Sequence, residues 1–142
     1  MREIKFRGLN GETGWHYGIP LTNKLGTYII FEKNPHICSQ YHYIEIDEFE
    51  VVKKETVSQW TGLLDKNDVE IYEGDIVKFI PSGEYGKVTT FGKSQNLGIE
   101  WENSKTAFFT PMFYLGCESE LEIIGNIYEN PELLEQEKWN IQ

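Results

Sequence analysis

The chain has 142 residues, enough for one domain or for two small lobes that share a core, and this length needs neither a disulfide nor a metal to fold. Its formal net charge of −10 repels phosphate backbones and anionic lipid surfaces, so composition argues against a nucleic-acid-binding or membrane-surface protein. The same charge is compatible with a solvated surface, a basic protein partner or mimicry of nucleic acid.

Charge is unevenly distributed along the chain. Residues 1–33 hold five basic and three acidic side chains, whereas residues 106–142 hold seven glutamates and one lysine. The two cysteines, Cys38 and Cys117, are far apart and indicate no disulfide framework. The amino terminus is charged from Arg2 onward, and no apolar run approaches the roughly 18 residues of a membrane span. We therefore expect a cytoplasmic protein with reduced thiols.

Short strands are predicted throughout the first part of the chain. Residues 2–8 alternate polar and apolar side chains, residues 10–14 form a turn cluster, and residues 15–19 alternate again, so the first two strands should pair as a hairpin. Residues 20–26 begin with a proline and predict a loop. Residues 27–31 are a short apolar run that predicts another strand.

A polar segment, Lys53–Glu55, marks the predicted end of an N-terminal β lobe over residues 1–55. Before it, residues 41–46 alternate as a strand, and an acidic patch follows from Glu45 to Glu50.

The stretch from Thr56 to Phe79 carries the densest turn and strand signals. A strand ends near Gly62, and the cluster that includes Asp65 and Asn67 predicts a turn, since short Asx side chains bond their own turn backbone. Gly74 and Asp75 predict a second turn before the next strand. We interpret these five residues as structural.

The last part of the chain continues the β pattern and then changes. Strands are predicted over residues 87–91, 97–101, 106–110 and 121–128, the last passing through Gly125. Asn130 and Pro131 suit a helix start, so a short helical tail is predicted over residues 131–142. We predict that residues 56–130 form an SH3-like, partly closed barrel. The expected fold is therefore mainly β and antiparallel, with an N-terminal β lobe, this barrel and a short C-terminal helix.

Four blocks of the sequence carry a family resemblance: Met1–Arg7, Glu55–Leu63, Asp65–Asn67 with Glu70–Val77, and Ile124–Leu134. In this order they resemble the YopX family. The resemblance implies a mostly β protein encoded by phages and prophages, and it implies no catalytic residues. The family often has glycine after the Asp-Lys-Asn turn, whereas this chain has Asp68, so we expect the turn to form with slight strain.

Glycine-flanked residues 81–91 offer a weak nucleic-acid site. Tyr85 and Phe91 are candidates for stacking on bases, with Lys87 and Lys93 beside them. The lysines of residues 81–105 are balanced by glutamates, and aromatic residues of small barrels more often belong to the core. We therefore favour a structural role.

Two further sets of residues are weak candidates for metal or catalytic chemistry. His36, Cys38 and His42 are zinc-ligand types without a paired Cys-x-x-Cys, and ordinary packing is favoured for them. Five carboxylates surround the two central turns, where turn stabilisation is the commoner role; they are Asp65, Asp68, Glu70, Glu73 and Asp75. No nucleophile motif or phosphate-binding loop occurs, so no catalytic, cofactor or metal residue is assigned.

We therefore expect a non-enzymatic phage or prophage accessory protein that binds a host or phage protein, with a basic partner best suited to the acidic C-terminal half. A nucleic-acid-binding barrel is the alternative, and a metal-dependent enzyme is the third class. Oligomeric state stays open, since unpaired edge strands allow self-association.

Overall fold

The computed structural model describes residues 4–91, 96–102, 109–111 and 120–134. The chain divides into two compact units, unit 1 (Met1–Gln59) and unit 2 (Trp60–Gln142). Each unit is an antiparallel β structure and is described by itself. The limits predicted from the sequence, 1–55, 56–130 and 131–142, remain predictions.

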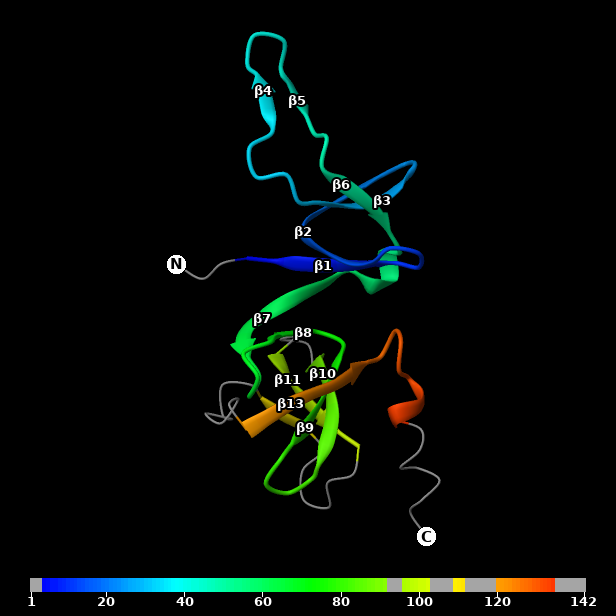
Figure 1. Cartoon of the computed structure of the whole chain (residues 1–142), viewed down its shortest axis with the longest axis vertical. Helices are drawn as coiled ribbons and strands as arrows, with labels where there is room; N and C mark the ends of the chain where they lie inside the picture. Colours follow the sequence, from blue (N-terminus) through cyan, green and yellow to red (C-terminus); the bar gives the residue numbers. More distant parts are fainter. Residues whose placement is uncertain (1–3, 92–95, 103–108, 112–119, 135–142) are drawn as a thin grey trace. The chain divides into compact units, whose positions relative to one another are not determined.

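Unit 1 contains a sheet with the strand order β6-β3-β2-β1 and a separate two-stranded hairpin (Figure 1). The sheet strands are β1 (Phe6–Asn10), β2 (Gly14–Asn23), β3 (Gly26–Ile30) and β6 (Phe49–Val52). The hairpin consists of β4 (His36–Cys38) and β5 (Tyr43–Glu45). A 3₁₀ turn, η1 (Lys54–Thr56), follows β6. The predicted pairing of the first two strands is confirmed, because Phe6–Asn10 pairs with Gly14–Gly18 in antiparallel register.

The prediction that residues 20–26 form a loop was wrong. Strand β2 continues through Pro20 to Asn23 and pairs with β3, with Pro20 opposite Ile29. Proline lacks an N–H donor and is tolerated where one edge of a strand is free of a ladder. The pairing of β2 with β1 ends at Gly18, so that edge of β2 is free beside Pro20.

The interior of unit 1 is small. Ile29 is fully buried, and Val52 is buried beside it on the same face of the sheet. Gly8 meets both side chains so closely that an added Cβ would lie 2.7 Å from Cγ2 of Val52. Thr56 completes this region, because its Oγ1 accepts a hydrogen bond from the Leu9 N–H at 2.8 Å.

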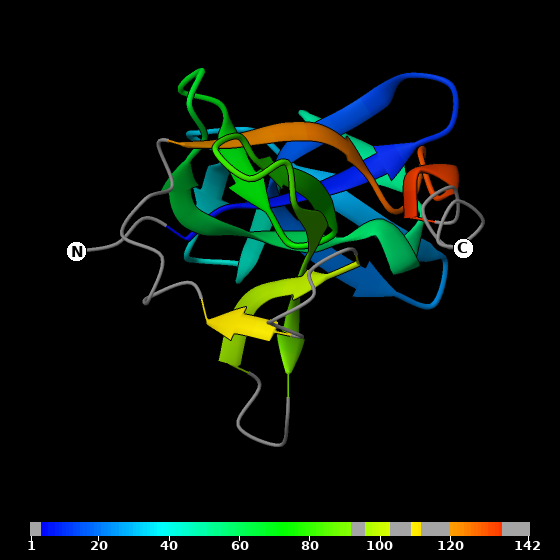
Figure 2. The ribbon, with the colours of Figure 1, turned by 90° about the horizontal axis from the view of Figure 1, so that it is seen from below.

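Strand β7 (Ser58–Leu64) begins in unit 1, where Ser58 and Gln59 pair with β1. Within unit 2 it pairs with β8 (Glu70–Tyr72). Unit 2 also has a five-stranded sheet in the order β12-β11-β10-β9-β13, and Figure 2 shows β12 (yellow) beside β11. Its strands are β9 (Asp75–Phe79), β10 (Tyr85–Phe91), β11 (Asn96–Trp101), β12 (Phe109–Pro111) and β13 (Leu121–Asn126).

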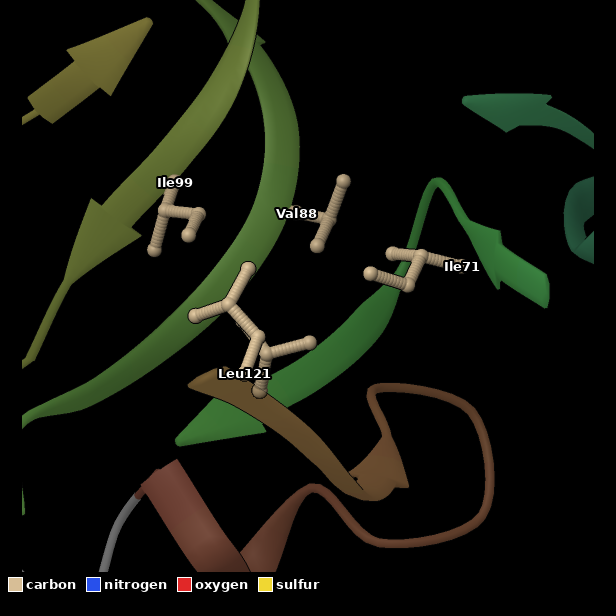
Figure 3. Packing of buried hydrophobic residues seen from close by; sticks show 5 residues of the cluster. Ile71, Val88, Ile99 and Leu121 are labelled. Atoms are coloured by element: carbon tan, nitrogen blue, oxygen red, sulfur yellow. The ribbon is translucent and has the colours of Figure 1, made fainter. Parts of the chain in front are cut away.

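One aliphatic cluster forms the core of unit 2. Ile71, Val88, Ile99 and Leu121 point toward one another from four different strands (Figure 3), and Val77 completes the cluster. All five are at most 1% exposed, and each buried side chain of this size contributes about 1.5–3 kcal/mol to folding. The apolar sides of these strands therefore pack against one another and form a core.

The predicted fold class is confirmed: the protein is mainly β, its sheets are antiparallel, and a short helix, described over residues 132–134, follows the last strand. The rest of the predicted helical tail, residues 135–142, lies outside the described residues. Among the described residues, the sheet of unit 2 ends at β12 and β13 without closing into a complete barrel. The predicted turn before β8 also forms, and Asp68 lies in the left-handed region with φ = 61°.

Replacing Asp68 with glycine should leave the free energy of unfolding unchanged or raise it by up to about 1 kcal/mol, because glycine carries no Cβ penalty at positive φ. Asn67→Gly is the matched control, since Asn67 has no positive φ and glycine there adds only freedom to the unfolded chain. Urea denaturation of both variants measures the difference. Equal losses in the two variants would contradict strain at Asp68.

Candidate functional site

Hydrogen bonds connect three of the predicted turn residues of unit 2 (Asp65, Gly74 and Asp75) to the last strand or the turn after it. The prediction that a strand ends near Gly62 was wrong, because β7 continues to Leu64 and Gly62 lies within it with φ = +88°. The Asp65 carboxylate accepts from the N–H of Ile123, at 3.1 Å, across a sequence separation of 58 residues. The Gly74 carbonyl accepts from the N–H of Ile127 at 2.8 Å. Asp75 pairs with Asn126 in the ladder between β9 and β13. Two of the four sequence blocks therefore meet around the last strand: Asp65–Asn67 with Glu70–Val77, and Ile124–Leu134.

Asp65 stabilises the turn between β7 and β8. Its Oδ1 accepts from the N–H groups of Asn67, at 2.8 Å, and Val69, at 3.0 Å. Its Oδ2 is the acceptor for Ile123, and the residue is only 4% exposed. A buried carboxylate whose oxygens accept three backbone N–H groups is engaged in holding the backbone.

Gly74 and Asp75 shape the second turn. Gly74 has φ = +89°, and an added Cβ would lie 2.9 Å from Cε2 of Tyr128. Asp75 is 2% exposed, and its Oδ2 accepts from the N–H of Tyr72 at 2.8 Å. This pair lets the chain reverse between β8 and β9 while the ring of Tyr128 packs directly over the turn.

The Asn126–Asn130 segment forms a third polar turn. The Asn126 side-chain oxygen accepts from the N–H groups of Tyr128, at 3.0 Å, and Glu129, at 2.9 Å. Asn130 was predicted to cap the helix; its Oδ1 accepts from the N–H of Asn126, at 3.2 Å, and so lies against the preceding turn. An added Cβ on Gly125 would lie 2.8 Å from this oxygen, which explains the glycine there.

The remaining carboxylates of the central region differ from Asp65 and Asp75, because none of them is buried. Asp68 is exposed, and Glu70 accepts a hydrogen bond from the Tyr72 hydroxyl at 3.1 Å. Glu73 is half-buried. Within the described part of the chain, no three His, Cys, Asp or Glu side chains are grouped so that they could hold a metal ion.

The predicted zinc-ligand types lie on the β4–β5 hairpin. His36 and Cys38 are two residues apart on β4, opposite Glu45 and Tyr43. His42 lies in the connecting loop with φ = 57°, and Cys117 is outside the described residues. The His36 ring contacts Tyr43, with centroids 6.2 Å apart.

The weak nucleic-acid candidates do not form an open basic surface where the structure describes them. Tyr85 is only 7% exposed, so its ring faces are not available for stacking on a base. The Lys87 ammonium lies 3.8 Å from the Glu100 carboxylate on the neighbouring strand. Neither the Phe91 side chain nor Lys93 is among the described parts.

Unit 1 has an exposed apolar surface that was not predicted from the sequence. Two cross-strand rows run over β2, β3 and β6: Ile19–Ile30–Phe49 and Leu21–Tyr28–Val51. We call these six residues the apolar face. Residues paired directly across strands lie on the same side of a sheet, which places all six together. The continuous apolar run at residues 27–31 was the available signal, because it gives β3 apolar side chains on both faces.

The apolar face contains a groove of about 290 Å³, lined by Leu21, Asn23, Tyr28, Ile30, Ile46 and Phe49. Phe49 contacts Tyr28 edge to face, with centroids 5.8 Å apart. Ile19, Leu21, Phe49 and Val51 are 43–55% exposed. In the described part of unit 1, the opposite side of this sheet holds the buried core and this side stays accessible.

The fold and these turns define a mainly β protein in which Asp65, Gly74, Asp75 and Asn126 shape the connections between strands. A family model described as YopX protein matches residues 5–135, and the chain belongs to the YopX family. Among solved structures, protein EF1440 from Enterococcus faecalis is similar, with 25% identity and a TM-score of 0.49 over 94% of this chain and 99% of that one. The comparison with curated proteins found no match. Helical segments among the described residues are too short or too polar to cross a bilayer.

Asp65→Asn should lower the free energy of unfolding by about 1–3 kcal/mol, because the amide turns one of two acceptor oxygens into a donor facing backbone N–H groups. Asp68→Asn, at an exposed side chain in the same turn, should change stability by less than about 0.5 kcal/mol. Urea unfolding measures both. Unchanged or increased stability in Asp65→Asn, as for a residue retained for chemistry, would contradict the structural role.

Gly74→Ala should lose at least about 1 kcal/mol more stability than Gly83→Ala, because the alanine methyl group displaces the Tyr128 ring. Gly83 also has a positive φ, +78°, but an added Cβ there meets nothing within 4 Å. The difference between the two variants therefore isolates the contact with Tyr128. Repeating Gly74→Ala in a Tyr128→Ala background should remove the excess; an excess that persists would assign it to the backbone.

Proposed function

We propose that this YopX-family chain is a non-enzymatic accessory protein of a phage or prophage, and that its acidic unit 2 binds a basic host or phage protein in the cytoplasm. The observation that carries the proposal is the segregation of charge between the units. Residues 1–59 hold seven basic and eight acidic side chains, a net charge of −1. Residues 60–142 hold six basic and fifteen acidic side chains, a net charge of −9.

Two lysines of unit 2 form ion pairs with glutamates of the same unit. The Lys66 ammonium lies 2.9 Å from the Glu122 carboxylate, and Lys87 lies near Glu100. Several carboxylates of unit 2 are exposed, including Asp68, Glu120 and Glu132. Such a field attracts a basic partner and accelerates its association, and it repels nucleic acid.

The hydrogen bonds of the polar residues in the family-like blocks also support a binding role. Asp65, Asp75 and Asn126 accept hydrogen bonds through their side-chain oxygens from backbone N–H groups of their own turns or of the strand before them. These residues are thereby explained by strand connection, and the proposal assigns recognition to exposed side chains around them.

Capture from lysates of phage-induced host cells tests the proposal, with the immobilised full chain as bait. The recovered proteins should be basic, and their retention should fall as salt is raised, since exposed charges are screened. The variant Asp68→Asn/Glu120→Gln/Glu132→Gln should retain several-fold less. Glu12→Gln/Glu45→Gln/Glu55→Gln is the matched control, with the same change of charge on exposed residues of unit 1.

Equal retention by both triple variants would contradict a role for unit 2. Gel shifts of DNA and RNA at low salt provide the competing outcome. Retardation of either nucleic acid would favour the nucleic-acid-binding alternative and overturn the proposed basic protein partner.

A further inference from the structure

Unit 1 has an apolar surface that its own sheet leaves uncovered, and the β4–β5 hairpin extends it. Ile37 and Ile44 are opposite one another in the hairpin ladder and are 65% and 58% exposed. Ile46, two residues after Ile44, lines the groove of the apolar face. The exposed isoleucines of the hairpin and the groove of the apolar face are therefore joined through a short segment that follows β5 (Tyr43–Glu45).

The hairpin lacks a third strand or a covering layer among the described residues. Figure 1 shows β4 and β5 extending away from the other strands of the unit. The base is fixed by hydrogen bonds from the N–H groups of Asp47 and Glu48 to the Glu32 carboxylate, at 2.6 and 3.0 Å. Two-stranded hairpins alone are marginal in water and gain stability when an apolar side is covered.

The exposed apolar area is large for a single unit. Six side chains of the apolar face and the hairpin are 43–65% exposed, which amounts to several hundred Å² of apolar surface. The largest apolar patch on a typical monomer is about 300–600 Å², and a stable interface buries about 800 Å² per partner, apolar core and polar rim together. With the polar residues around it, this surface is large enough for the core of a dimer interface.

The charge of unit 1 suits a second copy of this chain as the occupant. Two surfaces of unit 1, with a net charge of −1 each, meet with little repulsion. The net charge of −9 on unit 2 would oppose self-association through that unit. A basic partner is expected at unit 2 for the same reason, which leaves the near-neutral apolar surface for pairing of identical chains.

We propose that the protein self-associates through unit 1, with the β4–β5 hairpin of each copy packed into the groove of the apolar face of the other. A two-fold axis makes both contacts equivalent, as in most homodimers. Ile37 and Ile44 of one copy then cover Phe49 and Leu21 of its partner. The arrangement covers the isolated hairpin and the exposed sheet face in a single interaction.

Analytical ultracentrifugation of the full chain at increasing micromolar concentration tests the proposal. The wild type should dimerise, and Ile44→Lys and Phe49→Glu should each raise the dimer dissociation constant by at least roughly tenfold, because each places a charge in an apolar contact. Val69→Lys is the matched control, an equally exposed apolar residue of unit 2 at 50%, and should dimerise as the wild type does. Circular dichroism and urea unfolding establish that each variant is folded.

Mixing the two variants makes the test specific for the hairpin-to-face contact. In a mixed dimer, the opposite charges introduced by Ile44→Lys and Phe49→Glu face each other across one contact, and the second contact is unaltered. Equimolar Ile44→Lys and Phe49→Glu should therefore regain dimers that neither forms alone. A monomeric wild type would overturn the proposal, and dimers without rescue on mixing would overturn this contact. Neither outcome depends on whether unit 2 binds a basic protein.

Discussion

The buried carboxylate of Asp65 joins two distant parts of unit 2. Asp65 closes the turn between β7 and β8 with one oxygen and holds the N–H of Ile123 in β13 with the other. Its location in the core is tolerable because three backbone donors replace the water that an exposed carboxylate would bind. Leu121, two residues before Ile123 on β13, belongs with Ile71 to the aliphatic core, so the polar interaction and the core involve the same strand.

The strands and turns of this protein were largely predictable from the sequence, because alternation and turn residues act locally. Asp65, Gly74 and Asp75 were correctly placed at turns by residue type. Their contacts with β13 and the turn after it were not predictable, since they require the order β10-β9-β13, which no local pattern encodes. The continuation of β2 through Pro20 was missed for a related reason: a free strand edge tolerates proline, and edges are defined only by the assembled sheet.

The candidate sites also show the difference between local patterns and properties of the assembled sheets. Tyr85 has the aromatic ring that base stacking requires, yet the fold buries it, and residue type alone cannot distinguish these outcomes. The apolar face was missed because Ile19 and Phe49 belong to ordinary strand patterns, and a strand pattern says nothing about whether its second side is covered. Composition was more informative about the units: unit 1 is near neutral and unit 2 is acidic.

The position of β13 has a consequence for synthesis on the ribosome. Strand β9 lies between β10 and β13, and its residues Ile76 and Val77 are fully buried. The partner β13 begins only at Leu121, so nascent β9 keeps one unpaired apolar edge until more than forty further residues have been translated. Such edges promote aggregation while they last, and non-local pairing of this kind slows folding.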